Sequence, residues 1–104
     1  MPTYPALRSQ LVGTAAVKVG GFDTPADGAT LVGMMVCNVL STPITVTIHT
    51  QLSSTVTNVA KNREILAGGT LILDTSINLA SGEAVYVTSS DAASADVHMS
   101  LVAH

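Results

Sequence analysis

Apolar and polar residues alternate along most of this chain, and the alternation is clearest at residues 44–49. Ile44, Val46 and Ile48 fall on one side of an extended segment, while the threonines between them and His49 fall on the other. A period of two residues is typical of a β-strand that buries one face. The same reasoning predicts further strands at residues 10–19, 30–40, 55–61, 70–73, 77–79, 84–88 and 97–101.

Short runs of Gly, Pro and Ser separate these segments at regular intervals, for example at residues 20–21, 68–69 and 81–82. Such residues form turns. No window of eleven residues carries the apolar period of a helix, so at most one helical turn is expected. The sequence therefore predicts an all-β fold, a single antiparallel β-sandwich of jelly-roll type, formed by residues 10–104.

Residues 30–40 are apolar on both faces, unlike the other predicted strands. If this strand is unbroken, its two faces are formed by Leu31, Met35 and Val39, and by Val32, Met34, Val36 and Leu40. One face must enter the core of a sandwich. The second face has two open explanations: a loop covers it, or it contacts another subunit through Val32, Met34 and Val36. Large exposed apolar patches are uncommon on monomers, which gives the interface as much weight as the loop.

Residues 1–9 differ from the rest, because Pro2 and Pro5 disfavour regular strand pairing and favour an extended chain. Tyr4 and Leu7 supply two hydrophobic anchors in a segment of low charge. The segment is predicted to be an N-terminal arm that contacts a neighbouring subunit through Pro2, Tyr4, Pro5 and Leu7. A frayed terminus is the alternative.

Composition narrows the class of protein. Only 11% of the 104 residues are charged and the formal net charge is −3. Disordered chains are rich in charge, and nucleic-acid-binding chains carry a basic stripe, so neither class is expected. The longest apolar run, residues 31–37 with Gly33 counted, is far shorter than the about 20 residues of a membrane helix. No signal peptide is visible and Cys37 is the single cysteine, so synthesis in a reducing cytoplasm is expected.

No group of residues indicates an enzyme. His49 and His98 lie on the polar faces of their strands without the spacing of a zinc site. Asp23 and Asp27 occur in a Gly/Pro loop that is typical of a plain turn. No nucleophile elbow, phosphate-binding loop or distinctive carboxylate pair is present, so we expect no catalytic residues, no metal and no cofactor. Tyr86 is the one aromatic residue in a predicted strand, and we interpret it as a partly exposed packing residue; the alternative is a glycan site with this single ring as its platform.

The densest charge group is formed by Lys61, Arg63 and Glu64. A solvated loop explains it most simply. The alternative is a salt-bridge patch between subunits, which would fix the register of an interface more than its affinity.

Two motifs carry a resemblance to a known family. Residues 65–74 place an apolar–Ala–Gly–Gly turn before a strand, and residues 77–90 place a Gly–Glu turn before the next. Together with residues 30–49 and 95–102, this pattern resembles small virion structural proteins of tailed bacteriophages. The resemblance implies a β-sandwich that decorates or cements a capsid, or that lies in the neck or tail. It implies no catalytic residues.

The sequence thus leads to the hypothesis of a capsid decoration or cement protein. It would be made in the host cytoplasm and located in the virion. We expect a homo-oligomer, with a trimer favoured, that binds the major capsid protein or another virion protein, and no nucleic acid or membrane as partner. The alternative is a module associated with the tail or neck, with glycan binding as a further option.

Overall fold

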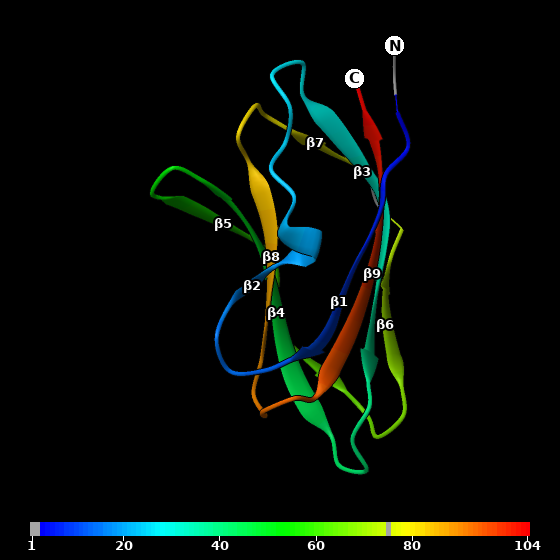
Figure 1. Ribbon diagram of the computed structural model, residues 1–104. Coiled ribbons are helices and arrows are strands. Elements are labelled where there is room, and N and C mark those ends of the chain that lie inside the picture. Colours follow the sequence, from blue (N-terminus) through cyan, green and yellow to red (C-terminus); the bar gives the residue numbers. More distant parts are fainter. Residues whose placement is uncertain (1–2, 75) are drawn as a thin grey trace.

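Nine strands and one short helix form the part of the chain that the computed structural model describes, residues 3–74 and 76–104 (Figure 1). The helix η1 (Val19–Gly21) is a single 3-10 turn. No helix of this part is long and apolar enough to cross a membrane. Each predicted strand overlaps at least one observed strand. In chain order these are β1 (Ala6–Val12), β2 (Val17–Lys18), β3 (Ala29–Asn38), β4 (Ile44–Leu52), β5 (Thr55–Ile65), β6 (Thr70–Leu73), β7 (Ile77–Leu79), β8 (Ala84–Ser89) and β9 (Ala95–Ala103).

The strands form two antiparallel sheets packed face to face. Sheet A has the order β1-β9-β3-β6, with β7 also paired to β3, and sheet B has the order β2-β8-β4-β5. The pairs are nested: β4 with β5, β3 with β6, β2 with β8 and β1 with β9. A long hairpin rolled into two sheets in this way is a jelly roll. The predicted all-β sandwich is confirmed.

The core lies between the two sheets and follows the alternation of the sequence. In β9 every odd-numbered residue from Ala95 to Ala103 is buried, and the residues between them are half-buried or exposed. In β4 the predicted inward residues Ile44, Val46 and Ile48 are buried. Full burial of one such side chain contributes about 1.5–3 kcal/mol, so the alternating residues hold the two sheets together.

A β-bulge interrupts β3. Leu31 pairs with Leu101, but Gly33 pairs with Ser100, so Val32 is an extra residue on the β3 side of the ladder. An extra residue reverses which side of the strand faces the core. The unbroken alternation assumed for residues 30–40 therefore fails at Val32.

The bulge corrects the predicted outward face of this strand. Met34 is 2% exposed and Val36 is 0% exposed, so both are core residues and neither is available to a partner in this fold. The outward residues are instead Val32, Met35 and Val39, each exposed by 43–45%. As expected, the strand carries apolar residues on both faces. The bulge, however, places different residues on each face than the unbroken alternation predicts.

The N-terminal segment belongs to sheet A. β1 pairs with β9 from Ala6 onwards, and Thr3 forms a bridge with Ala103 through two backbone hydrogen bonds of 2.8 Å. The expected boundary between an arm at residues 1–9 and a sandwich from residue 10 therefore falls inside β1. Pro2 lies outside the described residues. The two ends of the described chain lie side by side (Figure 1).

Candidate interaction surface on the outer face of sheet A

One row of side chains crosses the outer face of sheet A from edge to edge. Arg8 on β1 pairs with His98 on β9, His98 pairs with Met35 on β3, and Met35 pairs with Ile72 on β6. All four are exposed. The row is basic and polar towards β1 and apolar towards β6, where Ile72 is 62% exposed.

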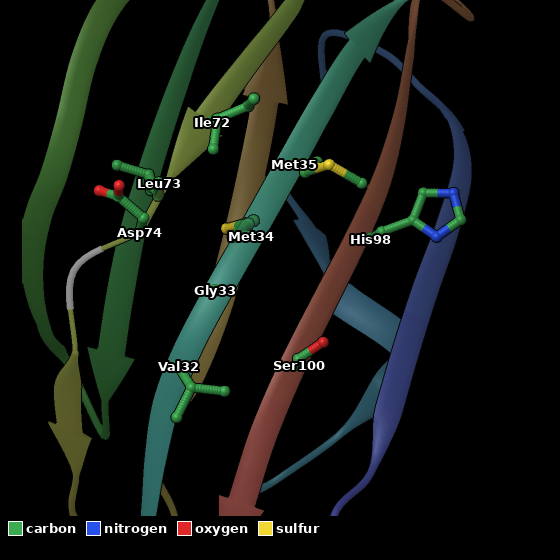
Figure 2. Close-up of a pocket in the computed structure, with 9 residues that line it drawn as sticks. All are labelled: Val32, Gly33, Met34, Met35, Ile72, Leu73, Asp74, His98 and Ser100. Carbon is green, nitrogen blue, oxygen red and sulfur yellow. The ribbon is translucent and has the colours of Figure 1, made fainter.

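A pocket of about 260 Å³ opens on this face over the β3 bulge (Figure 2). Val32, Met35 and Ile72 give it exposed apolar surface. Polar groups lie at its sides, with His98 towards β1 and Asp74 on the opposite side (Figure 2). The complete lining consists of Val32, Gly33, Met34, Met35, Ile72, Leu73, Asp74, His98 and Ser100.

Gly33 keeps this pocket open. A Cβ atom at Gly33 would meet only the carbonyl oxygen of Leu73, at 3.8 Å, which is an ordinary van der Waals distance. Gly33 is also not among the glycines with positive φ. Neither the backbone conformation nor close packing therefore requires glycine here. Its effect is to leave the space over the bulge unfilled.

The structure brings two of the residues predicted to contact a partner onto this face. Val32 lines the pocket, and Tyr4, on the segment leading into β1, is 73% exposed. Leu7, by contrast, packs against the core from the inner side of β1. Pro5 is half-buried, and its carbonyl oxygen accepts a hydrogen bond of 3.1 Å from the backbone N–H of Leu101.

The predicted charge patch lies on a different part of the molecule. Lys61, Arg63 and Glu64 are exposed on β5, the edge strand of sheet B, and not in a loop. Within residues 3–74 and 76–104, the one ion pair joins Lys18 and Asp23, with 2.8 Å between Nζ and Oδ1. The hydrogen bond to this carboxylate raises the pKa of the Lys18 ammonium group.

The four Lys and Arg residues of the sequence share one property, which is their position on edge strands. Arg8 lies on β1, Lys18 on β2, and Lys61 and Arg63 on β5. Charged side chains on an edge discourage pairing with a strand of another molecule. The remaining edge, formed by β6 and β7, consists of strands of four and three residues.

The outer face of sheet B is polar. His49 on β4 and Tyr86 on β8 pair across the sheet, and their rings stack with centroids 5.2 Å apart and planes 4° from parallel. Lys18 pairs with Tyr86, and Asn58 pairs with His49, which extends this row to both edges. The face offers hydrogen-bonding groups and little apolar surface.

Sequence reasoning did not single out Met35, Ile72 or His98 as site residues. Each lies on the outward side of its strand, but the pocket depends on β6 and β9 flanking β3, which no local pattern reveals. In the described part of the chain, no group of three or more His, Cys, Asp and Glu residues is placed to hold a metal ion. Cys37 is a free, half-buried cysteine on β3.

No protein-family model matches this chain, and no curated protein matches its sequence. Solved structures do match its fold. A chain in the acidic stable capsid structure of Helicobacter pylori bacteriophage KHP30 is similar over 97% of this chain and 86% of its own length, with a TM-score of 0.61 and 11% identity.

Two further structures match with lower scores. A chain of the disulfide-linked pili that form Bacillus endospore appendages matches with a TM-score of 0.53 and 10% identity, over 98% of this chain and 84% of its own length. A chain of infectious bursal disease virus, Gt strain, matches with a TM-score of 0.52 and 14% identity, over 99% of this chain but only 32% of its own length. At these identities the likeness shows a shared fold.

Proposed function

We propose that this protein is a virion structural protein, and specifically a decoration or cement protein that binds the major capsid lattice. The observation that carries the proposal is the match, over nearly the whole of both chains, to a chain of a bacteriophage capsid. Because both coverages are high, the matched chain is only slightly longer than this one. A small β-sandwich that occurs as a separate chain in a capsid structure supports a structural role in the virion, and a decoration protein is the form of that role that we propose.

The surface of the molecule supports the same role. The outer face of sheet A exposes Val32, Met35 and Ile72 around a pocket, with polar groups at its sides. An apolar centre with a polar rim is typical of protein interfaces. Burial of this face against neighbouring subunits would stabilise a shell by the hydrophobic effect, without catalysis or a cofactor. Self-association, with three copies favoured, is part of the proposal.

The likeness to endospore pili suggests a filament subunit instead, and the cysteine count argues against the disulfide-linked form. Each subunit of such a filament must link to two neighbours, which requires at least two cysteines per chain. This sequence contains one, Cys37. A single cysteine can join two chains but cannot propagate a covalent filament.

The role is tested on gradient-purified particles from cells that produce this protein. Quantitative mass spectrometry should find the chain in the particle fraction, in a fixed and high ratio to the major capsid protein. Adding the purified protein back to particles that lack it should raise the temperature at which they release DNA. A chain that stays in the soluble fraction at every stage would contradict the virion role.

The second candidate is a module of the neck or tail that binds a glycan. The observation in its favour is the stacked His49–Tyr86 pair on the polar face of sheet B, because aromatic rings and hydrogen-bonding groups together suit sugars. A neck or tail module should be present in a few copies per particle and should bind glycans on an array, and Tyr86→Ala should abolish that binding. A high copy number on heads, together with no binding to any glycan on the array, would exclude this candidate.

A further inference from the structure

The pocket over the β3 bulge is open in the single chain. Val32, Met35 and Ile72 around it are 43%, 45% and 62% exposed, so three apolar side chains around one pocket face water. Exposed apolar side chains gathered around a pocket are candidates for a contact site. The question is therefore which group enters the pocket.

Tyr4 is the most exposed large apolar side chain of the described residues, at 73%. The β1–β9 register is constant from the Thr3–Ala103 bridge through Ala6–Ser100. This register sets Tyr4 on the same side of the sheet as Ala6, and therefore on the face that carries the pocket. β1 is two strands from β3, a separation of about 10 Å, so Tyr4 does not fill the pocket of its own molecule.

We propose that the pocket on the outer face of sheet A receives the Tyr4 side chain of a second copy of this chain. The sizes agree, because a protein cavity of about 150 Å³ already holds a benzene ring, and this pocket has about 260 Å³. The chemistry also agrees. The ring meets the apolar side chains, and the hydroxyl group reaches one of the polar groups at the sides of the pocket, which are Asp74, His98 and Ser100.

The charges around the two features are complementary. Arg8 lies on the same face of β1 as Tyr4, and Asp74 lies at the side of the pocket. When Tyr4 of one copy enters the pocket of another, the guanidinium group of that copy approaches the Asp74 carboxylate of the other. Opposite charges beside an apolar anchor fix orientation and favour encounter. Because the anchor and the pocket share one face, two copies can fill each other's pockets, and a ring of copies can fill one pocket each.

The contact rests on the self-association that the proposed function includes, and it is measured on the purified protein without any particle. In sedimentation velocity over a range of concentrations, the wild-type chain should associate. Tyr4→Ala and Gly33→Leu should each weaken association by at least about 30-fold, the effect of removing an interface hot spot. Val56→Ala, which shortens a 52% exposed apolar side chain on β5 of sheet B, is the matched control and should change nothing.

A mixing experiment separates the two halves of the contact. Tyr4→Ala keeps the pocket and lacks the anchor, while Gly33→Leu keeps the anchor and has a filled pocket. Each alone should be monomeric at a concentration where the mixture forms pairs. Circular dichroism checks that Gly33→Leu is folded, and Ile72→Thr at the pocket replaces it if it is not.

Fluorescence gives a readout at the anchor itself. In a Tyr86→Phe background, Tyr4 is the one remaining tyrosine, and the sequence contains no tryptophan. Quenching of its emission by acrylamide should fall several-fold as association proceeds.

A wild-type chain that stays monomeric would overturn both the contact and the self-association in the proposed function. Association that survives Tyr4→Ala and Gly33→Leu would overturn the contact alone and place a different partner surface in that role.

Discussion

The side chain of Asn38 joins the end of β3 to two other segments, residues 40–42 and residues 65–66, at one end of the sandwich. Its Nδ2 atom donates hydrogen bonds to the backbone carbonyl groups of Thr42, Ile65 and Leu66, at 2.8, 3.1 and 3.2 Å. Its Oδ1 atom accepts one of 2.9 Å from the backbone N–H of Leu40. Asn38 is 1% exposed, so water cannot replace these partners.

Asn38→Leu keeps the approximate volume of the side chain but removes its hydrogen bonds, including the buried one to the carbonyl group of Ile65. We expect the free energy of unfolding to fall by roughly 1–3 kcal/mol, the cost of one unsatisfied buried polar group. Chemical denaturation measures it. The same substitution at the exposed Asn58 of β5 should change stability by less than about 0.5 kcal/mol. Equal effects at both positions would show that the hydrogen bonds of Asn38 contribute little.

Leu11 has a backbone conformation that suits glycine. Its φ is 52°, and its side chain is 58% exposed, so little burial compensates for the left-handed geometry. Leu11→Gly should raise the free energy of unfolding by about 1 kcal/mol, because a left-handed residue with a Cβ atom costs about 1–2 kcal/mol. The neighbouring Gln10 has no positive φ, and Gln10→Gly should lower stability by about 0.5–1 kcal/mol. A loss of stability in both variants would contradict this reasoning.

At the scale of the element, β5 shows how an exposed edge strand is kept from pairing with another molecule. Its register with β4 shifts twice, between Val46 and Ile48 and again between Ile48 and His49. Asn62 lies at the first of these register shifts and has a φ of 52°. Its backbone N–H donates a hydrogen bond of 3.1 Å to Oγ1 of Thr47. Bulges and charged side chains are two devices that make an edge a poor template. We therefore interpret Lys61 and Arg63 as residues that prevent another strand from pairing with this edge, whether or not they also contact a subunit.

Replacing both cations of β5, in Lys61→Thr/Arg63→Thr, should increase the rate of aggregation several-fold, measured by light scattering below the unfolding temperature. The variant has a formal net charge of −5 instead of −3. A larger net charge favours solubility, so faster aggregation would come from the exposed edge. A lysine at the exposed Thr57 of the same strand should restore the wild-type rate. An unchanged rate of aggregation in the double variant would show that Lys61 and Arg63 do not protect this edge from pairing.

Much of the fold was predictable from sequence because alternation is a local property. Residues 77–79 were predicted as a strand and form β7, and the outward threonines of β4 were assigned to the correct face. The bulge at Val32 was not predictable, because no residue pattern there fixes which strand lies opposite. For the same reason Met34 and Val36 were assigned to a surface when they belong to the core. The pocket needs three strands from distant parts of the sequence, so its existence follows only from the pairing.

At the scale of the whole molecule, self-association and stability are linked. Subunits that bind each other only when folded gain stability from mass action. Above the dissociation constant, each tenfold rise in protein concentration should raise Tm by about 3–6 °C for a chain of this size. The Tyr4→Ala variant should have a Tm that is independent of concentration over the same range. Differential scanning calorimetry measures both, and a wild-type Tm independent of concentration would show that the chain does not associate.

The nested pairing of the jelly roll also has a consequence for the order of folding. β4 and β5 are joined by a short turn, and each further pair, β3 with β6, then β2 with β8, then β1 with β9, closes a longer loop. Once the inner pair has formed, each outer pair adds only a modest closure entropy, so we expect folding to proceed from the turn towards the termini. β9 lies between β1 and β3, and sheet A is therefore incomplete until residues 95–103 have been synthesised. In the proposed role, this chain would therefore join an assembly as a finished molecule and not while it still emerges from the ribosome.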